Sequence, residues 1–404
     1  MSNLKIGVIV DNEFTGDLRV ENEVKILREA DFDVTVLCLN FGSKPREEYF
    51  EGAKITRIKF PKFFQSKLRP FVNTPLDVYS LLWKRFISRF VIKNKIDVLH
   101  VHDLYMAIPV LKANLPKRVK LILDLHENYI EALFSYSWTN SFPLKMLVNK
   151  SKWAALEKKT LFLFDKIVVL SENFRDYFLA TYPSIERDKF IVYPNYPRID
   201  QLLSYPIDKN IIDKSDSFLL FYFGVIAKRR GIFTLFDAMN KLVDNYPQIK
   251  LLLIGPVDKK DQEQFNIYLS SEKLKDKTIY YPWKDMKDFP SYASVSDVCV
   301  SPLIKNKQHE SGIANKVFQY MLFGKPLIVS NCKPQEKLVE ENKCGIVFKS
   351  ENSEDLSQRI VELYNDASKR ESMGRNSEKA VHEKYNLKVS GTKLIDLYNE
   401  VNKN

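Results

Sequence analysis

The chain has 404 residues, of which 45% are hydrophobic and 13% aromatic, and it carries 62 Lys and Arg against 51 Asp and Glu. This composition excludes a disordered or fibrous protein and is sufficient for two or three domains with large cores. The net charge of +11 indicates an anionic partner. Charge alone does not choose between nucleic acid, a membrane surface and a phosphorylated substrate.

The cysteines and the N-terminal segment predict a cytoplasmic protein. The four cysteines are scattered and form no CxxC pair, which argues against a zinc ribbon or a disulfide scaffold and favours a reducing compartment. The apolar run at residues 6–10 is too short for the core of a signal peptide. No stretch approaches the ~18 uninterrupted apolar residues of a membrane-spanning helix.

Short apolar runs alternate with longer amphipathic stretches through the first half of the chain. Seven runs predict strands: KIGVIVD, FDVTVLCLN, AKITRIKF, IDVLHVHD, VKLILDLHE, KIVVLSE and FIVYPN. Most are nearly continuous in apolar residues, as strands covered on both faces are. Between the first two, Val20, Val24 and Leu27 follow the spacing of one helix face. Repeated strand–helix units predict a mainly parallel sheet.

The alternation breaks after Pro194 and then resumes. Residues 194–216 hold three prolines and several turn-forming residues, and we predict a linker at residues 198–214. Six further runs follow: FLLFYFG, IKLLLIG, TIYYP, DVCVSP, PLIVS and CGIVFK. We therefore predict an α/β protein with two Rossmann-like domains, residues 1–197 and 215–386. An amphipathic helix at 387–404 follows the last strand, and its pattern allows it to pack on either domain.

The strongest candidate site is the segment HESGIANKVFQYMLFGKPLIVS at residues 309–330. A loop of small residues leads into a helix predicted at 315–322, which Gly324 ends. Free backbone N–H groups and the helix dipole at such a start favour a phosphate. Lys316 would add a full positive charge, and Gln319 could hydrogen-bond a ribose hydroxyl. The same pattern also fits an ordinary strand–helix loop.

A basic turn lies in the segment FGVIAKRRGIFTLFDAM at the start of the same domain. A strand ends at Gly224, three cations follow at 228–230, and a helix begins after Gly231. Ligands of open parallel sheets bind beyond the carboxyl ends of the strands, so this turn suits a diphosphate. A solvated basic loop is the commoner explanation of such a turn alone, but the two segments reinforce each other.

Two neighbouring strands of the first domain end in a histidine beside an acid. The first ends in His100, His102 and Asp103, and the next in His126 and Glu127. Alternation places both histidines of the first strand on one face, and only His102 reaches the strand end. An imidazole there could exchange a proton with a substrate.

The sequence predicts no catalytic metal and no bound cofactor. The pair Asp31 and Asp33 matches the DxD pattern of metal-dependent sugar transfer, but it lies at the start of a strand, and we interpret it as a turn. No nucleophile elbow, Walker loop or GxGxxG follows a strand.

Residues 61–95 carry eight Lys and Arg and one acid, interleaved with aromatic residues. From Leu76 onward the pattern predicts a helix with an apolar and a basic face, which is typical of membrane-surface helices. Nucleic-acid binders and simply solvated basic helices share this pattern. The aromatic residues Trp83, Phe86 and Phe90 fit shallow membrane insertion or a core-facing stripe equally well. The basic residues are less ambiguous: Lys84, Arg85, Arg89 and Lys93.

Taken in order, these motifs resemble glycosyltransferase family 4, retaining enzymes of the GT-B fold, over nearly the whole chain. Six segments carry the likeness: DNEFTGDLRVENEVKILREADFDVTVL, IDVLHVHD, LDLHE, KIVVLSE with VYPN, FGVIAKRRGIFTLFDAM and NKVFQYMLFGKPLIVS. The resemblance implies two domains facing across a cleft, a C-terminal helix that crosses back to the first domain, and metal-independent transfer of a hexose.

The resemblance also assigns roles to single residues. The second domain would bind a nucleotide-sugar donor, and the first a glycan or lipid-linked acceptor, with His102 as the catalytic residue. Donor-binding residues would be Gly224, Arg230, Glu310, Gly312, Ile313, Lys316 and Gln319. The acceptor site or cleft would include Gly16, Arg19, Asp103, His126 and Glu127.

The chain departs from the family at two places. The family often carries two Glu with seven residues between them. In this chain the second falls on Gln319 and the first on Ser311, one place from Glu310. Thr15-Gly16-Asp17 stands where the family has a Gly-Gly pair. These departures keep open a catalytically silent nucleotide-sugar-binding subunit, and a related sugar-nucleotide epimerase is a further alternative.

The predicted function is transfer of a sugar to a glycan or lipid-linked acceptor in cell-surface polysaccharide or glycolipid synthesis. Binding of nucleic acid explains the charge but none of the strand-end motifs, so we do not expect it. The basic segment at residues 63–95 predicts a peripheral contact with the inner face of the cell membrane.

Overall fold

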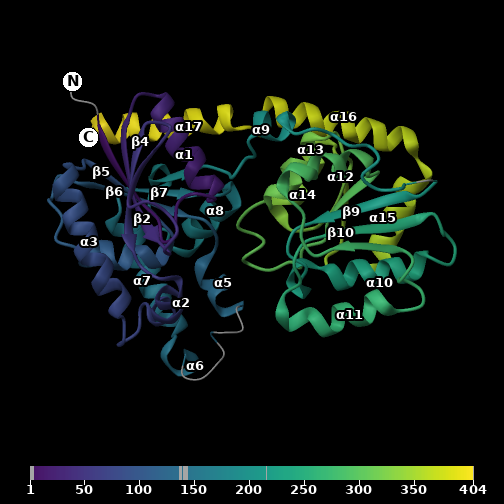
Figure 1. Ribbon diagram of the computed structural model, residues 1–404, viewed down its shortest axis with the longest axis horizontal. Coiled ribbons are helices and arrows are strands. Elements are labelled where there is room, and N and C mark those ends of the chain that lie inside the picture. The colour runs from purple at the N-terminus through teal and green to yellow at the C-terminus, as the bar shows by residue number, and fades with distance from the viewer. Residues whose placement is uncertain (1–3, 136–138, 140–143, 215, 404) are drawn as a thin grey trace. The chain divides into compact units, whose positions relative to one another are not determined.

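The computed structural model describes residues 4–135, 139, 144–214 and 216–403 and divides into two compact units (Figure 1). The first unit contains Met1–Asn195 together with Ser390–Asn404, and the second contains Tyr196–Val389. Each unit has its own sheet with helices packed on it, so the predicted fold class of two parallel-sheet α/β domains is confirmed.

The first unit has an eight-stranded sheet in the order β3-β4-β2-β1-β5-β6-β7-β8. All of its strands are parallel except β3, which pairs antiparallel with β4. The chain reverses its direction of travel across the sheet at β1, which lies between β2 and β5. The strand bounds are β1 Lys5–Ile9, β2 Asp33–Asn40, β3 Glu47–Phe50, β4 Ala53–Lys59, β5 Val98–His102, β6 Lys120–Leu125, β7 Lys166–Val169 and β8 Phe190–Val192.

The helices of the first unit follow from apolar faces and polar caps. In α1 the Asp17 side chain accepts a hydrogen bond from the Val20 N–H, and Val20, Val24 and Leu27 are buried as their spacing predicts. The bounds are α1 Leu18–Glu29, α2 Lys62–Leu68, α3 Val78–Asn94, α4 Ala107–Lys112, α5 Tyr129–Ser135, α6 Leu144–Leu147, α7 Lys150–Leu163 and α8 Glu172–Thr181.

The C-terminal helix α17 (Leu387–Lys403) returns to the first unit, as the resemblance implies. Its Tyr398 is fully buried, and the hydroxyl lies 2.7 Å from Nδ1 of His100 on β5. Glu400 forms an ion pair at 2.6 Å with Lys166 of β7. The last helix of the sequence thus contributes to the core behind the strand that carries the two predicted histidines.

The second unit has a six-stranded, fully parallel sheet in the order β11-β10-β9-β12-β13-β14. Its order reverses between the neighbouring strands β9 and β12, because β9 leads to β10 on one side and β12 leads to β13 on the other. Ligands of such a sheet bind at the loops after these two neighbouring strands, β9 and β12. The strands are β9 Phe218–Phe223, β10 Ile249–Ile254, β11 Thr278–Tyr281, β12 Val298–Ser301, β13 Leu327–Ser330 and β14 Gly345–Phe348. The helices are α9 Ile199–Ser204, α10 Ile232–Leu242, α11 Gln262–Ser270, α12 Phe289–Val295, α13 Asn315–Leu322, α14 Lys333–Asn342, α15 Ser353–Asn365 and α16 Ala367–Glu383.

Two sequence-based expectations differ from the structure. Residues 198–214, predicted as a linker, belong to the second unit, because α9 forms there and Leu202 and Ile212 are buried in its core. Ser215, where the second domain is expected to begin, lies outside the described residues. Each of the thirteen predicted runs contains a strand, but β3 is not among them because its sequence, EEYF, lacks an apolar run.

The helix predicted from the basic segment is α3, and its aromatic stripe faces the core. Trp83 and Phe90 are buried, and Phe86 packs against the same core cluster. The alternative of shallow membrane insertion through these three rings is therefore wrong. The basic residues of α3 lie on the outer part of the helix, where Arg85, Arg89 and Lys93 are exposed.

Candidate functional site

In the second unit, the loop after β9 turns sharply next to the end of β12. Gly224 ends the strand with φ 123°, and residues 228–230 form a short 3₁₀ turn before α10. Gly231 has φ 76°, and a Cβ atom there would lie 1.7 Å from the carbonyl oxygen of Pro302. Only glycine allows this approach, which holds the basic turn against the loop that leads to α13.

Lys316 in the first turn of α13 is the most unusual cation of this unit. Only 8% of the residue is exposed, and Nζ lies 3.5 Å from the centroid of the Tyr222 ring. Burial, and next the nearby charge of Arg230, hold the pKa of Lys316 well below its usual value. Among the described residues its ammonium has no carboxylate partner, so an anion bound here would stabilise the charged form.

The start of α13 is open to a ligand. Ala314 stands at the cap position and offers no side chain to the first N–H groups of the helix. Gly312 and Ile313 precede it with intermediate exposure, and Gln319 lies one turn after Lys316 on the same face. Within the described part of the chain the Gln319 side chain makes no hydrogen bond, although the residue is only 7% exposed.

Glu310 and His309 precede this helix, and only Glu310 is among the donor-binding residues predicted from the sequence. Glu310 accepts a hydrogen bond from the Lys333 N–H at the start of α14, so it has a structural contact besides its predicted donor role. His309 is buried, and its Nδ1 lies 2.7 Å from the carbonyl oxygen of Ile304. If Nδ1–H donates there, Nε2, which is buried with no partner among the described residues, is an acceptor. A buried imidazole with an unused nitrogen, whose pKa is lowered by burial and also by the nearby charge of Arg230, is a feature that strand-end motifs do not encode.

In the first unit, Arg19 and Asp124 form a buried ion pair at the end of β6. Nε and Nη2 of Arg19 donate to both carboxylate oxygens at 2.8–3.1 Å. Arg19 also donates to the carbonyl of Tyr193 and lies 3.2 Å from Glu23 of the same helix. Although burial acts to raise it, the Arg19 charge holds the pKa of Asp124 below its usual value.

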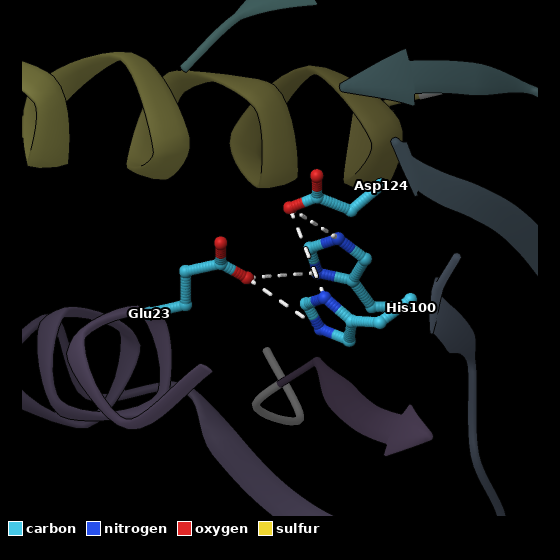
Figure 2. Close-up of side chains that lie close together, drawn as sticks. Glu23, His100 and Asp124 are labelled. Carbon is cyan, nitrogen blue, oxygen red and sulfur yellow. Dashed lines mark ion pairs between the residues drawn. The ribbon is translucent and has the colours of Figure 1, made fainter. Parts of the chain in front are cut away.

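Two imidazole rings lie between Glu23 and Asp124 (Figure 2). His100 and His102 stack with ring centroids 4.6 Å apart, and each has one nitrogen toward each carboxylate at 3.6–3.9 Å. Burial lowers the pKa of His100 to about 4 and holds that of His102 well below its usual value, so both rings are neutral at pH 7. Burial, with the Asp124 charge, raises the pKa of Glu23 well above its usual value.

His102 has no exposed surface, which corrects its predicted position beside the substrate. Its Nδ1 lies 2.9 Å from Nε2 of His126, whose side chain is 22% exposed. His126 in turn lies 3.9 Å from Asp103, a residue held at φ 72° directly after β5. The accessible imidazole of the cluster is therefore His126, with His102 behind it.

Two further residues of the first unit were predicted as site residues, Gly16 and Glu127. Gly16 has φ 97°, and its N–H donates to Glu21, which orders the loop before α1. Glu127 follows His126 with intermediate exposure.

Four side chains could hold a metal ion as judged over the residues that the structure describes: Glu23, His100, His102 and Asp124. Their ligand atoms lie within 4.8 Å of one another. However, imidazole binds a metal in the plane of its ring, and the planes of the two stacked rings differ by only 24°. Both Asp124 oxygens already accept from Arg19. These two features argue against a metal centre. Nε2 of both histidines and both Glu23 oxygens are nevertheless buried without a hydrogen-bond partner among the described residues.

A second polar group at the same end of this sheet was missed in the sequence. Asp11 follows β1, is buried, and accepts hydrogen bonds from the hydroxyls of Tyr79 and Tyr105. Arg69 lies 3.7 Å from the same carboxylate, and burial raises the pKa of Asp11 to about 6. The signal was available, since KIGVIVD ends in an acid at the carboxyl end of a strand.

Comparison with known proteins places both units in one enzyme class. A family model described as "Glycosyltransferase Family 4" matches residues 19–196, and one described as "Glycosyl transferases group 1" matches residues 206–380. The chain is a glycosyltransferase of the family 4 type. The match covers nearly all of both units, and the six segments recognised in the sequence lie largely within it.

Curated relatives of this glycosyltransferase are distant. It is 22% identical over 60% of its length to the capsular polysaccharide biosynthesis glycosyltransferase CapM of Staphylococcus aureus, of which the match spans 64%. It is also 22% identical over 76% of its length to spore coat protein SA of Bacillus subtilis, of which 79% is covered.

Solved structures share the GT-B fold along the whole chain. The sucrose-phosphate synthase of Thermosynechococcus elongatus has a TM-score of 0.77 at 16% identity, with 99% of each chain covered. The Anabaena protein HepE in complex with UDP has a TM-score of 0.70 at 14% identity, over 98% of this chain and all of that one. At these identities the likeness establishes the fold.

Among its described helices, the glycosyltransferase has none that combines the length and the apolarity needed to cross a bilayer.

Proposed function

We propose that this glycosyltransferase is a retaining, metal-independent hexosyltransferase that uses a nucleotide-sugar donor in the synthesis of a cell-surface polysaccharide or glycolipid. The observation that carries the proposal is the convergence of Arg230, Lys316 and the open start of α13 at the carboxyl end of one sheet. The names of CapM and HepE support the substrate classes, since one is a capsular polysaccharide enzyme and the other binds UDP.

On the donor side, the second unit would stabilise the leaving diphosphate. Fixed cations and backbone N–H groups can neutralise the charge that develops on a leaving phosphate, a role that a metal has in other transferases. A bound anion would oppose the lowering of the Lys316 pKa and so favour the charged form of this side chain. Gln319 and His309 would face the nucleoside, where their unused acceptor atoms suit ribose hydroxyls.

On the acceptor side, His126 would contact the incoming hydroxyl or the transferred sugar, with His102 fixing its ring. The leaving phosphate can itself take the acceptor proton in retaining transfer, so the imidazole is needed for position rather than as a strong base. We expect His126→Ala to lower kcat far more than it weakens nucleotide binding. His102→Ala should give a smaller loss of the same kind.

A catalytically silent nucleotide-sugar-binding subunit is the alternative that a specific observation favours, because Gln319 replaces a charged residue of the family. One assay separates the two. Nucleotide sugars that differ in base and sugar are first screened by thermal shift, and transfer is then measured with and without EDTA. Turnover unaffected by EDTA supports the proposal. Binding without transfer or hydrolysis of any donor would favour the silent subunit, and interconversion of the donor sugar would favour an epimerase.

We further propose a cytoplasmic enzyme that associates with the inner face of the membrane through residues 63–95. Each Lys or Arg near an anionic bilayer contributes ~1 kcal/mol, so a few suffice for reversible attachment. Co-sedimentation with anionic but not neutral vesicles, reversed by salt, is the expected result. No sedimentation at low salt would leave the basic face merely solvated.

A further inference from the structure

The excess positive charge of the chain is concentrated in one segment. Residues 44–95 carry 13 Lys and Arg against four Asp and Glu, while the whole chain has an excess of 11. This segment contains β3, β4, α2 and α3, all of the first unit. Neither the strand-end histidines nor the donor loops account for it.

The same segment surrounds a cavity of about 790 Å³ between the C-terminal half of α3 and strands β2 and β4. Its volume lies in the range of small-molecule sites. The cations that line it come from three elements and the loop after β2: Lys44, Arg46, Lys54, Arg57, Lys59, Arg89 and Lys93.

Two of these cations are already paired. Arg57 is buried and donates to Glu48, Thr15 and two backbone carbonyls, and Lys54 lies 3.0 Å from Glu47. The other five have no carboxylate within 4 Å among the described residues. The hydrogen bond from Lys54, with the charges of Lys93 and Arg46, lowers the pKa of Glu47, as a positive potential requires.

The cavity also has an apolar wall. Leu37, Ile58, Phe86 and Phe90 line it between the cations, and Leu39, Phe60 and Trp83 form a small hollow beside Ile58 and Phe86. A purely anionic ligand does not need such a wall, and a flat bilayer surface does not need a cavity. Strand β2 lies three strands from β6, whose end carries His126, which is roughly 14 Å, so a ligand seated here could extend toward that imidazole.

We propose that this cavity binds the phosphate-bearing end of a lipid-linked acceptor, with its phosphates on the unpaired cations and the first part of its hydrocarbon chain on the apolar wall. Only the identification of this lipid as the acceptor rests on the proposed function. The binding itself is a property of the first unit.

Direct binding tests it in the full chain with Arg230→Ala as background, which weakens the anion site of the second unit. Three probes are titrated by calorimetry: geranylgeranyl diphosphate, inorganic diphosphate and geranylgeraniol. Two matched variants of α3 each lose two cations, Arg89→Gln with Lys93→Gln inside the cavity and Lys84→Gln with Arg85→Gln outside it. We expect the prenyl diphosphate to bind best. The cavity pair should weaken it about tenfold, and the outer pair less than twofold.

Other results would overturn the proposal, and none depends on sugar transfer. No binding of the prenyl diphosphate, or equal weakening by both pairs, would remove the cavity as a site. If inorganic diphosphate binds as tightly as the prenyl diphosphate, the apolar wall does not bind a hydrocarbon chain. If geranylgeraniol binds as tightly, the cations do not bind the phosphates. Binding of phosphatidylglycerol vesicles that both pairs weaken alike, without binding of the soluble probe, would make α3 a membrane-facing surface. Absence of donor turnover in the wild-type chain, with prenyl diphosphate binding intact, would instead count against the proposed function.

Discussion

Apart from the edge strands β3 and β8, the two sheets share one strand order, yet the carboxyl ends of their strands carry opposite chemistry. In the first unit, buried acids and imidazoles contact one another around Arg19, and little of the group is exposed. In the second unit, α13 begins without a side-chain cap, and Lys316 has no carboxylate partner among the described residues. The first arrangement is made by contacts within the protein, whereas we propose that the second is completed by the donor diphosphate. We conclude that the fold supplies the place of each site and the loops its chemistry.

The comparison predicts its largest effect for the pair that holds the first network together. Arg19→Met leaves Asp124 and Glu23 as buried carboxyls without a cation, and removing one partner of a buried ion pair costs about 3–5 kcal/mol. We expect a loss of that size in the free energy of unfolding, measured by chemical denaturation.

The matched control combines Arg19→Met with Asp124→Asn. Because the double variant no longer buries an unpaired Asp124 charge, it should recover a large part of the loss. Strictly additive effects would show that the two residues are not coupled and would contradict the network.

In the second unit the same kind of change should affect turnover rather than stability. Arg230→Ala and Lys316→Ala would each remove a proposed contact to the donor diphosphate, for which we expect about 2–5 kcal/mol. Lys316 has no carboxylate partner to leave behind among the described residues. We expect kcat/KM for the donor to fall at least about 30-fold, with unfolding nearly unchanged. Lys305→Ala, on the loop before α13, is the control. Wild-type kinetics in both variants would remove the diphosphate site.

Sequence reasoning predicted most of the fold and about half of the first site. Continuous apolar runs such as KIVVLSE identify a parallel strand wherever it is covered on both faces, but the edge strand β3 has no such run. Likewise, alternation put His100 and His102 on one face but could not show that Tyr398, nearly 300 residues later, covers them. Which imidazole is exposed depends on that long-range packing, so His126 could not be chosen over His102.

A buried acid of the first unit, Glu157, also predicts that the stability of this unit depends on pH. Burial raises the pKa of Glu157 on α7 from 4.5 to about 7. The native state therefore keeps a proton that the unfolded chain releases, and stability falls as the pH rises from about 4.5 to 7. Over that window the loss amounts to about 3 kcal/mol.

Glu157→Gln removes this loss and keeps the oxygen that accepts from the Tyr182 hydroxyl. We expect the variant to be more stable than wild type at pH 8 and to differ little at pH 4.5, as measured by denaturation at both values. A parallel pH dependence of the two proteins would mean that Glu157 is ionised in the native state.

The smallest effect is expected at Gln319, where the second unit departs from the family. Its side chain has no hydrogen-bond partner among the described residues, so Gln319→Glu breaks no contact, and a carboxylate accepts from a ribose hydroxyl more strongly than an amide does. We expect a KM for the donor lowered by up to about fivefold, with stability unchanged within ~0.5 kcal/mol.

Gln335→Glu shows what a core glutamine would do instead. Its Nε2 donates to the carbonyl oxygens of Ser301 and Ser330, and both contacts would turn repulsive with a carboxylate. This control should be clearly destabilised. If Gln319→Glu loses as much stability as the control, then Gln319 belongs to the core. In that case its side-chain oxygen is not available to a ribose hydroxyl, and this difference between the two units disappears. If instead stability holds and donor KM rises, the amide is the better ribose partner, and the departure from the family is an adaptation of this site rather than a sign of lost activity.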